Sequence, residues 1–585
     1  MDWIFERFSR IIFHDFEFQA PAGEAPAPVC LVAKEVTSKG TRTIRLFGEK
    51  LLGTHVPPFD VGPCTLVVAY YASAEWGCFL ELGWPLPARS LDLYAEFRAL
   101  TSGKKCPHGY RLLGAAAYFG LPVMAGVRKS AMRERILYGA PFTDCEQTEI
   151  LGYCEDDVDE LMRLFECMQP EFKVDKRLGQ GLFRGRFTQA IAVMERRGVP
   201  VDMELYPWLL ANGQVLQKDI TSAPAAHGLW ENGSFSHVRF EELLTTMGLN
   251  AVWPRTRTGM ARLDKDTMRD MSGRHPVISE LSEVFRLVTA LAELKLGVGL
   301  DGRTRCLLSP FGTKTGRCGT SSNRYIFGLG KTIRPLIKPR RGTALAVLDY
   351  SQQEFAIGGV LSGDKAMQSD YESGDPYLAL AIRAGAAPLG ATAATHTRVR
   401  DQYKRCVLAV QYGAGARSLG AWLGIDPLAA EQLLRHHRRL YHRFWTWQNS
   451  ILAHFQFHGR LETVFGWPVH VDGDFNPRSV INFPMQANGA EILRLACIWA
   501  NENGIDICAP VHDAVLIEAP LDGIEQETDR MHEIMVEAGR QVLDGFELRV
   551  DSRIIRYPDR YPGHHDNEIW SWLYGRFEEE HGRSE

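Results

Sequence analysis

Residues 347–355 read VLDYSQQEF, an apolar β-type run that ends on Asp349 and is followed by polar residues. Residues 511–518 read VHDAVLIE and place Asp513 at the end of a second such run. Two carboxylates at strand ends can share a pair of divalent cations about 3.5–4 Å apart, as nucleotidyl transfer requires. A single aspartate at a strand end is commonly a turn or cap residue. The two together, rather than either alone, predict a metal site.

A basic stripe is expected on the helix predicted over residues 397–410. Arg400, Lys404, Leu408 and Tyr412 follow one another at a spacing close to one helical turn, so they project from one side. Arginine can grip phosphate oxygens with two hydrogen bonds, and a lysine can also protonate a departing pyrophosphate. A stripe with Leu408 and Tyr412 could be core packing, but Arg400 and Lys404 would not share a core face. The stripe therefore predicts a triphosphate site.

The bulk composition is that of an ordinary globular protein. The chain has 585 residues, 45% of them hydrophobic and 23% charged, which predicts several domains with a sizeable core. The net charge, 66 − 71 = −5, gives no overall signature of nucleic-acid binding, so any such surface must be local. Basic clusters occur at residues 331–341, 398–405 and 435–439, although each could equally be a solvated face.

The cysteine pattern and the chain start bear on the cellular compartment. The 12 cysteines form no CxxC pair and no zinc-ligand spacing, which is typical of a reduced intracellular protein without structural zinc. The sequence has no apolar run of the roughly 20 residues that a membrane-spanning helix needs, and no signal-peptide pattern. A candidate catalytic motif already begins at Asp15, so we expect no cleaved leader. We expect a cytoplasmic protein of a bacterial or phage-infected cell.

Hydrophobic periodicity predicts a mixed α/β chain with a helical middle part. Strands are predicted at residues 30–36, 64–69 and 344–348, and a strand–turn–strand unit at 505–519 with His512 and Asp513 in its turn. Helices are predicted at residues 150–165, 183–197, 275–296, 397–410 and 487–501, and a turn-rich segment at 252–264.

From about residue 181 to the C-terminus the chain resembles family A DNA polymerases, the DNA polymerase I family. DYSQQE resembles motif A of that family, the helix over residues 400–413 resembles motif B, and VHD resembles motif C. Three further matches occur in the expected order: Thr315-Gly316-Arg317 with Asn323, the segment GRLET at residues 459–463, and Arg478, Asn482 and Gln486 within RSVINFPMQANGAEI.

The resemblance implies a role for each matched residue. Asp349 and Asp513, with the Tyr350 carbonyl, would bind two Mg²⁺ ions. Arg400, Lys404 and Tyr377 would contact the triphosphate, Leu408 the sugar, and Tyr412 the templating base. Glu354 would be the steric gate that excludes a ribose 2′-hydroxyl. DNA would be contacted by Arg317, Asn323, Arg478, Asn482, Gln486 and His512. The implied partners are primer–template DNA and dNTPs.

Three residues depart from the family pattern. Leu408 stands where Phe or Tyr is common, so we expect altered discrimination against dideoxynucleotides and slower incorporation. Ala514 replaces a Glu that often follows the His-Asp pair, which leaves both principal carboxylates in place. Tyr377 replaces a His that helps to hold phosphate, and because a phenol can still donate a hydrogen bond, we expect weaker triphosphate binding.

The N-terminal region carries a second acidic constellation. FHDFEF at residues 13–18 places Asp15 and Glu17 on the same side of a strand. In YCEDDV at residues 153–158, Tyr153 precedes Asp157 by one helical turn. This pattern resembles the DEDDy 3′–5′ exonucleases, in which three such carboxylates would bind two Mg²⁺ or Mn²⁺ ions and the tyrosine would orient the attacking water.

The middle carboxylate of that family is replaced here. Glu75, in the sequence ASAEW, stands where an Asp is usual, which keeps the charge but lengthens the side chain by a methylene. Asp92 matches a later, supporting aspartate better. Whether the exonuclease is active is left open by this substitution.

The resemblances together predict an α/β multidomain protein: a ribonuclease H-like exonuclease domain and then a right-hand polymerase with a thumb, an antiparallel palm sheet and helical fingers. We expect the exonuclease-like domain at 1–180, the thumb and connecting helices at 181–300, and palm and fingers at 301–585, with fingers at about 365–450. We expect no 5′ nuclease domain before Asp15, as the resemblance to large-fragment, bacteriophage-like enzymes implies. We expect a monomer, and accessory replication proteins stay an open question from the sequence.

Two alternatives stay open from sequence. A single-subunit RNA polymerase shares similar palm motifs, but Glu354 and the exonuclease-like region argue against it. A DNA-binding protein with a degenerate exonuclease site is the other, and the intact set of Asp349, Asp513, Arg400 and Lys404 argues against it.

Overall fold

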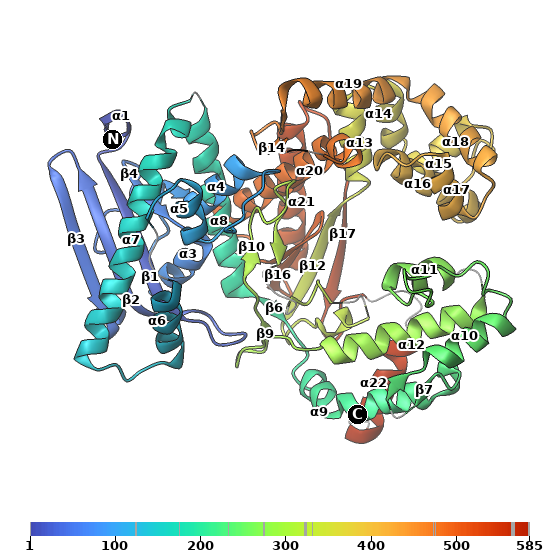
Figure 1. Ribbon diagram of the computed structural model, residues 1–585, viewed down its shortest axis with the longest axis horizontal. Helices are drawn as coiled ribbons and strands as arrows, with labels where there is room; N and C mark the ends of the chain where they lie inside the picture. The colour runs from blue at the N-terminus through green and yellow to red at the C-terminus, as the bar shows by residue number, and fades with distance from the viewer. Residues whose placement is uncertain are drawn as a thin grey trace. The chain divides into compact units, whose positions relative to one another are not determined.

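The computed structural model describes residues 2–122, 126–174, 176–231, 233–272, 275–320, 325–329, 332–471, 473, 475–562 and 568–582. The chain divides into two compact units, whose elements are labelled in Figure 1. The first unit comprises Met1–Gly198, Leu307–Ser321 and Leu345–Ile554, and the second comprises Val199–Cys306, Ser322–Ala344 and Ile555–Glu585. Among the described helices, none is both long and apolar enough to cross a membrane.

The N-terminal part of the first unit is built on a five-stranded sheet in the order β3-β2-β1-β4-β5. Strand β1 pairs antiparallel with β2 and parallel with β4, and β4 pairs parallel with β5. The strands are β1 (Arg10–Gln19), β2 (Ala27–Thr37), β3 (Gly40–Phe47), β4 (Thr65–Ala69) and β5 (Ser90–Asp92). The strands predicted at residues 30–36 and 64–69 are therefore confirmed.

Alternation along β1 separates two hydrophobic cores, one on each face of this sheet. Ile11 and Phe13 belong to the core that α7 (Asp144–Lys173) covers, whereas Ile12 and Phe16 belong to the core against α3. Asp15 and Glu17 continue the first series and so face α7, which lies across β1 and β2 (Figure 1). The other helices of this part are α1 (Asp2–Phe5), α2 (Gly48–Leu52), α3 (Ala72–Glu81), α4 (Leu93–Thr101), α5 (Leu112–Tyr118), α6 (Gly126–Tyr138) and α8 (Arg177–Arg197).

The domain boundary expected at residues 180–181 falls inside α8. The glycines of this segment suggest a linker, but Gly181 is a packing position. A Cβ added there would lie 2.8 Å from Leu91 Cδ1 and 3.3 Å from Glu96 Cδ. Beside it, Arg184 forms a buried two-bond ion pair with Glu96, at 2.6 Å for each bond. The helix therefore crosses this point without interruption.

A second sheet of the first unit has the order β15-β16-β12-β17. Its strands are β12 (Thr343–Tyr350), β15 (Ile507–Val511), β16 (Ala514–Pro520) and β17 (Val550–Arg556). Val511 pairs with Ala514 across the antiparallel β15–β16 hairpin, which leaves His512 and Asp513 as its two-residue turn. His512 adopts a left-handed φ of 57°, as such short turns require. The predicted strand–turn–strand unit is confirmed.

The remaining elements of the first unit are mostly helical. They are β10 (Leu308–Ser309), β11 (Gly319–Thr320), α13 (Gln353–Leu361), α14 (Lys365–Glu372), α15 (Pro376–Arg383), α16 (Thr397–Gln411), α17 (Ala416–Leu423), α18 (Pro427–Leu440), α19 (His442–His458), β13 (Arg460–Glu462), β14 (Pro468–His470), α20 (Pro477–Glu502) and α21 (Ile524–Val542). The helices predicted at residues 397–410 and 487–501 are confirmed by α16 and α20.

The second unit is a small helical body that the C-terminus joins. Its elements are β6 (Val199–Pro200), α9 (Leu205–Ser222), η1 (Pro224–Ala226), β7 (Trp230–Glu231), β8 (Ser234–Phe235), α10 (His237–Thr246), α11 (Lys265–Ser272), α12 (Pro276–Glu293), β9 (Arg303–Thr304), η2 (Arg334–Leu336) and α22 (Glu568–His581). Helix α22 lies beside α9 (Figure 1), and the rings of Trp208 and Phe577 meet edge to face with centroids 5.5 Å apart.

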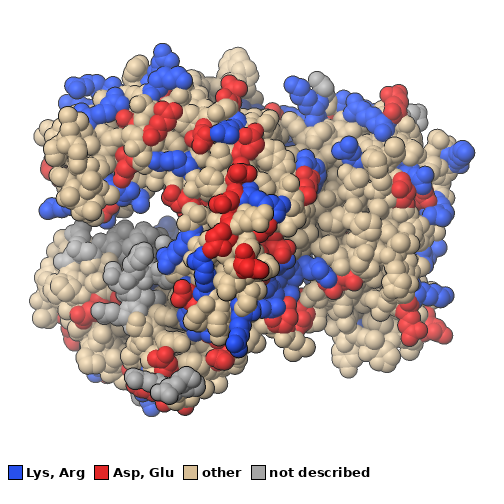
Figure 2. All heavy atoms as spheres, turned by 180° about the vertical axis from the view of Figure 1, so that it is seen from behind, with Lys and Arg blue, Asp and Glu red and all other residues tan. Residues whose placement is uncertain are grey.

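Charged side chains of both signs are interspersed over the described residues of the face in Figure 2. This mixture agrees with the small net charge of −5. Local arrangements of charge, rather than an overall field, must therefore carry any recognition of a polyanion.

Candidate active sites

The sheet order brings Asp349 and Asp513 together. Asp349 stands near the end of β12, and Asp513 lies in the hairpin turn just before β16, the strand next to β12, where its carbonyl accepts a hydrogen bond from Tyr350 N at 3.3 Å. Burial, followed by repulsion from Asp513 and from Asp551, raises the pKa of Asp349 to about 6. Carboxylates that repel each other in this way are stabilised by a shared cation.

The donor set fits a hard divalent cation. Mg²⁺ prefers carboxylate and carbonyl oxygens, and this end of the sheet presents the carboxylates of Asp349 and Asp513. Asp551 of β17, which accepts a hydrogen bond from Ser351 Oγ, adds a third acidic group that sequence reasoning missed. Only the strand order, with β17 next to β12, reveals it.

Arg317 joins two of the predicted acidic residues. Its Nη2 lies 3.1 Å from Glu354 Oε1 and 3.1 Å from Asp513 Oδ1. Burial raises the pKa of Glu354, although Arg317 opposes that rise. The Arg317 guanidinium thus compensates the negative charge of Glu354 and Asp513 at the place where the sequence predicts a metal ion.

The loop that presents Arg317 is held from behind by buried side chains. Arg494 Nη2 donates to Gly316 O at 2.8 Å, and Trp467 Nε1 donates to Lys314 O at 2.9 Å. Gly316 has a φ of 72°, and a Cβ added there would lie 3.0 Å from the Trp467 ring, so a side chain at this position would be strained.

The GRLET segment belongs to this support. Thr463 Oγ1 donates to Glu491 Oε1 at 2.7 Å, and Glu491 forms a buried ion pair with Arg494. Trp467, Glu491 and Arg494 were not found from the sequence. Their neighbours in the chain are apolar, so the sequence around them is typical of packing.

A polar chain connects Glu354 with α20. Tyr412 hydrogen-bonds with Glu354 and Asn482, and Gln486 Nε2 donates to the Tyr412 hydroxyl at 3.3 Å. Asn482 is buried, and within the described residues its Oδ1 has no hydrogen-bond partner. Five residues from four separate motifs are thus in contact, since Arg317 contacts Glu354 as well.

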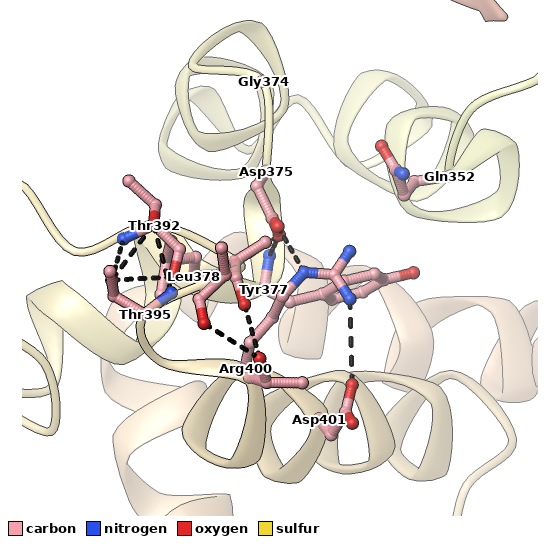
Figure 3. A network of polar contacts seen from close by, with 12 residues as sticks. Gln352, Gly374, Asp375, Tyr377, Leu378, Thr392, Thr395, Arg400 and Asp401 are labelled. Carbon is pink, nitrogen blue, oxygen red and sulfur yellow. Dashed lines mark hydrogen bonds and ion pairs between the residues drawn. The ribbon is translucent and has the colours of Figure 1, made fainter.

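The stripe on α16 faces away from the core, as predicted. Arg400 and Leu408 are half-buried and Lys404 and Tyr412 are exposed, whereas Cys406 is buried on the opposite side of the helix. Arg400 Nε forms an ion pair with Asp375, and the guanidinium carbon lies 5.6 Å from the centroid of the Tyr377 ring (Figure 3). Burial raises the pKa of Tyr377 to about 12.

The other predicted DNA contacts are at or near the surface. Arg478 begins α20, and its Cγ would lie 3.2 Å from a Cβ added to Gly413, which has a φ of 66°. The small residue therefore lets the Arg478 stem pack on the turn after α16. His512 is exposed at the hairpin turn. Asn323 lies outside the described residues.

The second acidic site forms where β1 faces α7. Carboxylate oxygens of Asp15, Glu17 and Asp157 all lie within 4.8 Å of one another, as a metal ion requires. Burial, followed by repulsion from Asp157, raises the pKa of Asp15 to about 8. Tyr153 lies one turn before Asp157 on the same face of α7, as the sequence predicts.

Lys129 of α6 is a member of this site that sequence reasoning missed. Its ammonium donates to both oxygens of Asp157, at 2.7 and 2.8 Å, and lies 5.6 Å from the centroid of the Tyr153 ring. A pocket of about 510 Å³ opens beside it. Its polar and charged lining residues include Glu17, His108, Arg111, Lys129, Arg133 and Tyr153.

Glu75 does not join the group of three carboxylates. It is 4% exposed on α3, and its Oε2 accepts a hydrogen bond from Phe16 N at 2.8 Å. Because α3 covers the opposite face of β1, the side chain reaches the backbone of that strand instead. Asp92 has a supporting role: it caps α4 and accepts hydrogen bonds from Tyr71 N and Tyr94 N, both at 2.9 Å.

Comparisons with known proteins point to one family. The family model described as DNA polymerase family A matches residues 232–554. The chain is 26% identical over 385 residues to "DNA polymerase I, thermostable" of Thermus filiformis, covering 60% of this chain and 45% of that protein. It is 24% identical over 444 residues to "DNA polymerase I" of Aquifex aeolicus (strain VF5), covering 69% of this chain and 75% of that protein. The chain therefore spans about half the length of the Thermus relative.

One solved structure shares the fold over nearly the whole chain. It is described as the POL domain of Pol1 from M. smegmatis in complex with DNA primer-template and dNTP. The likeness has a TM-score of 0.72 at 18% identity and covers 94% of this chain and 96% of that one. The fold is thus that of a family A polymerase domain. Together with the family match over more than half of its length, this places the chain in DNA polymerase family A.

Proposed function

We propose that this chain is a template-directed DNA polymerase that adds dNTPs to a primer 3′ end. The observation that carries the proposal is Arg317, held between Asp513 and Glu354 with Asp349 close by. Residues that lie far apart in the sequence thereby form one acidic site with a basic helix nearby. Such a site suits two-metal nucleotidyl transfer.

Asp349, Asp513 and the Tyr350 carbonyl are the residues that would hold two Mg²⁺ ions. When bound, such ions lower the pKa of the primer 3′-hydroxyl and neutralise the triphosphate. Arg400 binds phosphate oxygens, and the exposed ammonium of Lys404 gives its proton to the leaving pyrophosphate. Arg317, which pairs with Asp513 and Glu354 here, would contact the primer backbone if bound cations compensated those carboxylates instead.

Sugar selection falls to Glu354. Its carboxylate is fixed by Arg317 at 3.1 Å and by Tyr412, so it keeps one position against a ribose 2′-hydroxyl. This proposal favours dNTPs over rNTPs and argues against the RNA polymerase alternative. Arg478, Asn482, Gln486 and His512 contact the DNA.

We also propose a 3′–5′ exonuclease in the N-terminal region, carried by the convergence of Asp15, Glu17 and Asp157. These carboxylates would hold Mg²⁺ or Mn²⁺, and Tyr153 orients the attacking water. With Glu75 bound to the β1 backbone, three carboxylates rather than four serve the metal. The pocket lined by Arg111 and Arg133 suits the phosphates of a DNA 3′ end.

The proposed domains follow from these sites. The N-terminal residues form the exonuclease-like domain, whose strand order β3-β2-β1-β4-β5 fits a ribonuclease H-like sheet. Because α8 runs unbroken through the boundary expected at residues 180–181, this domain extends to Gly198. The thumb expected at 181–300 then corresponds to the helical second unit, and palm and fingers to the later segments of the first unit. The sheet β15-β16-β12-β17, with both principal acids at its end, fits the palm.

The test is primer extension with Mg²⁺ on matched and 3′-mismatched primers, with dNTPs and rNTPs in parallel reactions. The wild type, Asp349→Ala and Asp15→Ala are compared. We expect Asp349→Ala to abolish extension and keep trimming, and Asp15→Ala to do the reverse. Efficient extension with rNTPs would favour the RNA polymerase alternative. Binding of DNA without extension or trimming by the wild type would favour the end-binding alternative.

A further inference from the structure

Asp375 holds the guanidinium of Arg400 in a defined position. Its Oδ2 forms an ion pair with Arg400 Nε. Its Oδ1 accepts hydrogen bonds from Tyr377 N at 3.2 Å and from Leu378 N at 3.1 Å (Figure 3). One carboxylate therefore caps α15 and anchors the arginine. Oδ1 alone makes both capping hydrogen bonds, so Oδ2 serves Arg400 and not the helix cap.

The atom used for the anchor leaves the phosphate-binding edge available. Asp375 contacts Nε, whereas Nη1 lies 3.8 Å from Asp401 on the same helix. The Tyr377 ring supports one face of the guanidinium, with 5.6 Å between Arg400 Cζ and the ring centroid. An arginine held by its Nε and its face can still bind an anion through its terminal nitrogens.

The anchor is itself tied to the end of the palm sheet. Arg549, the residue before β17, donates to the carbonyl of Gly374, which precedes Asp375, and to Gln352 Oε1 at 2.6 Å. Ser351 N donates to Arg549 O at 3.0 Å, two residues after the acidic Asp349. Asp375 thus sits at a fixed place relative to the strand end that carries the acids.

We propose that Asp375 is a positioning residue that presents Arg400 to the triphosphate of the incoming nucleotide. The proposal rests on the polymerase function proposed above and deepens it. A free arginine side chain loses rotamer entropy when it binds an anion. Asp375 imposes that order before the nucleotide arrives, so it acts on nucleotide affinity rather than on the chemical step.

The decisive variant is Asp375→Asn. Asparagine keeps an oxygen acceptor for the two capping amides but loses the charge that holds Arg400. We expect the KM for dNTP to rise about five- to tenfold with kcat within about twofold, as expected for lost preorganisation. The melting temperature should stay unchanged. The matched control is Asp401→Asn, which removes the other carboxylate near Arg400 and should leave KM within about twofold.

A second measurement separates the anchor from the rest of the site. In an Arg400→Ala background, Asp375→Asn should have no further effect, because its partner is gone. Equal effects in both backgrounds, or a KM that falls or stays the same in Asp375→Asn alone, would overturn the proposal.

Nucleotide binding without turnover keeps the two proposals distinguishable. With a dideoxy-terminated primer, the Kd of the next dNTP is measured on the wild type and on Asp375→Asn. A weaker Kd in the variant supports the positioning role even if the wild type fails to extend a normal primer, a result that would count only against the polymerase proposal. An unchanged Kd would count against Asp375 in either case.

Discussion

At the scale of single residues, the acids of the polymerase site depend on a balance of charge. Asp349 and Asp513 repel each other, and Arg317 compensates Asp513 and Glu354 at 3.1 Å each. The Glu354 carboxylate is therefore held in one position, where it would block a ribose 2′-hydroxyl in the proposed sugar site. Its position is set by one cation and one phenol.

Replacing Glu354 with alanine tests whether its side chain excludes the ribose 2′-hydroxyl. We expect Glu354→Ala to reduce the preference for dNTP over rNTP by about 100-fold, because space opens for the 2′-hydroxyl. Single-nucleotide insertion with a dNTP and its matching rNTP measures the ratio of kcat/KM values. Gln368→Ala, a buried change on α14, is the control for general disturbance and should leave the ratio unchanged. An unaltered ratio in Glu354→Ala would place sugar selection elsewhere.

We expect the Lys129 ammonium to compete with a metal ion for Asp157 at the second site. Replacing it with methionine removes the ammonium bound to Asp157 at 2.7 and 2.8 Å. We expect Mn²⁺ to bind about tenfold tighter, since a tenfold change needs only about 1.4 kcal/mol of electrostatic repulsion. Electron paramagnetic resonance of free Mn²⁺ in an Asp349→Ala background measures this site alone.

The control for that experiment lies on the same face of the domain. Lys34→Met removes an ammonium that pairs with Glu155 and Asp159 of α7 instead. Its Mn²⁺ affinity should equal that of the parent. If Lys129→Met bound Mn²⁺ no more tightly than Lys34→Met, Lys129 would be a neighbour of the metal site rather than a competitor.

The sequence could point to Asp349, Glu354, Arg400 and Asp513 because each stands at a special place in a local pattern. Lys129, Glu491 and Arg494 have no such pattern, since their partners come from other segments of the chain. Glu75 shows the converse limit. Its place in the sequence is that of a metal ligand in the exonuclease family. The fold, however, sets Glu75 on the opposite face of β1, where its carboxylate accepts a hydrogen bond from Phe16 N.

At the scale of elements, α20 supports the loop that carries Arg317. Arg494 and Glu491 are 2% and 1% exposed, so removing one leaves the other charge buried. We expect Arg494→Met to cost about 3–5 kcal/mol of stability and to lower extension strongly. The double variant Arg494→Met with Glu491→Gln should recover much of the stability but not the activity, because Gly316 O still lacks its donor. Urea denaturation and primer extension measure the two effects, and full recovery of activity would contradict the supporting role.

Helix α8 and strand β10 share a buried acid that predicts a pH dependence. Glu195 Oε1 accepts a hydrogen bond from Leu308 N at 2.5 Å, and burial raises its pKa from 4.5 to about 8. The folded protein therefore keeps a proton that the unfolded chain releases. Stability contributed by this group is present below pH 4.5 and is lost as pH rises towards 8.

Glu195→Gln should abolish the loss of folding stability between pH 4.5 and 8 that Glu195 causes. Glutamine keeps the acceptor for Leu308 N without a charge to bury, so we expect the variant to be more stable than the wild type at pH 8 and similar at pH 4.5. Thermal melts at several pH values measure the difference. Glu204→Gln, a change in the same residue type at the N-cap of α9, is the control. A difference between Glu195→Gln and the wild type that does not grow with pH would refute this account.

Element by element, the predictable parts were those with strong local signals. The β15–β16 hairpin, α16 and α20 follow from apolar runs with turn residues between them. The boundary expected at residues 180–181 does not break α8, because Gly181 serves close packing on Leu91 and Glu96. A glycine that relieves a contact and a glycine that ends a helix look alike in a single sequence.

At the scale of the whole molecule, the division into two units could not be foreseen from the sequence. The second unit gathers Val199–Cys306, Ser322–Ala344 and the C-terminal residues, which are far apart in the chain. Helix α22 gives no functional motif, yet it completes this unit. Trp208 Nε1 donates to Glu580 Oε2 at 2.6 Å, and Arg576 pairs with Asp219 at 2.6 Å.

This arrangement predicts that α22 stabilises the second unit in particular. Phe577 is 8% exposed and packs on Trp208, whereas Trp572 on the same helix is 37% exposed. We expect Phe577→Ala to cost about 3 kcal/mol, and Trp572→Ala less than about 1 kcal/mol. Hydrogen exchange should then accelerate in α9 of Phe577→Ala while α16, in the first unit, keeps the exchange rate of the wild type. Equal acceleration in α9 and α16 would show that the two units unfold as one cooperative body, and unchanged exchange in α9 would show that α22 contributes little to the stability of its unit.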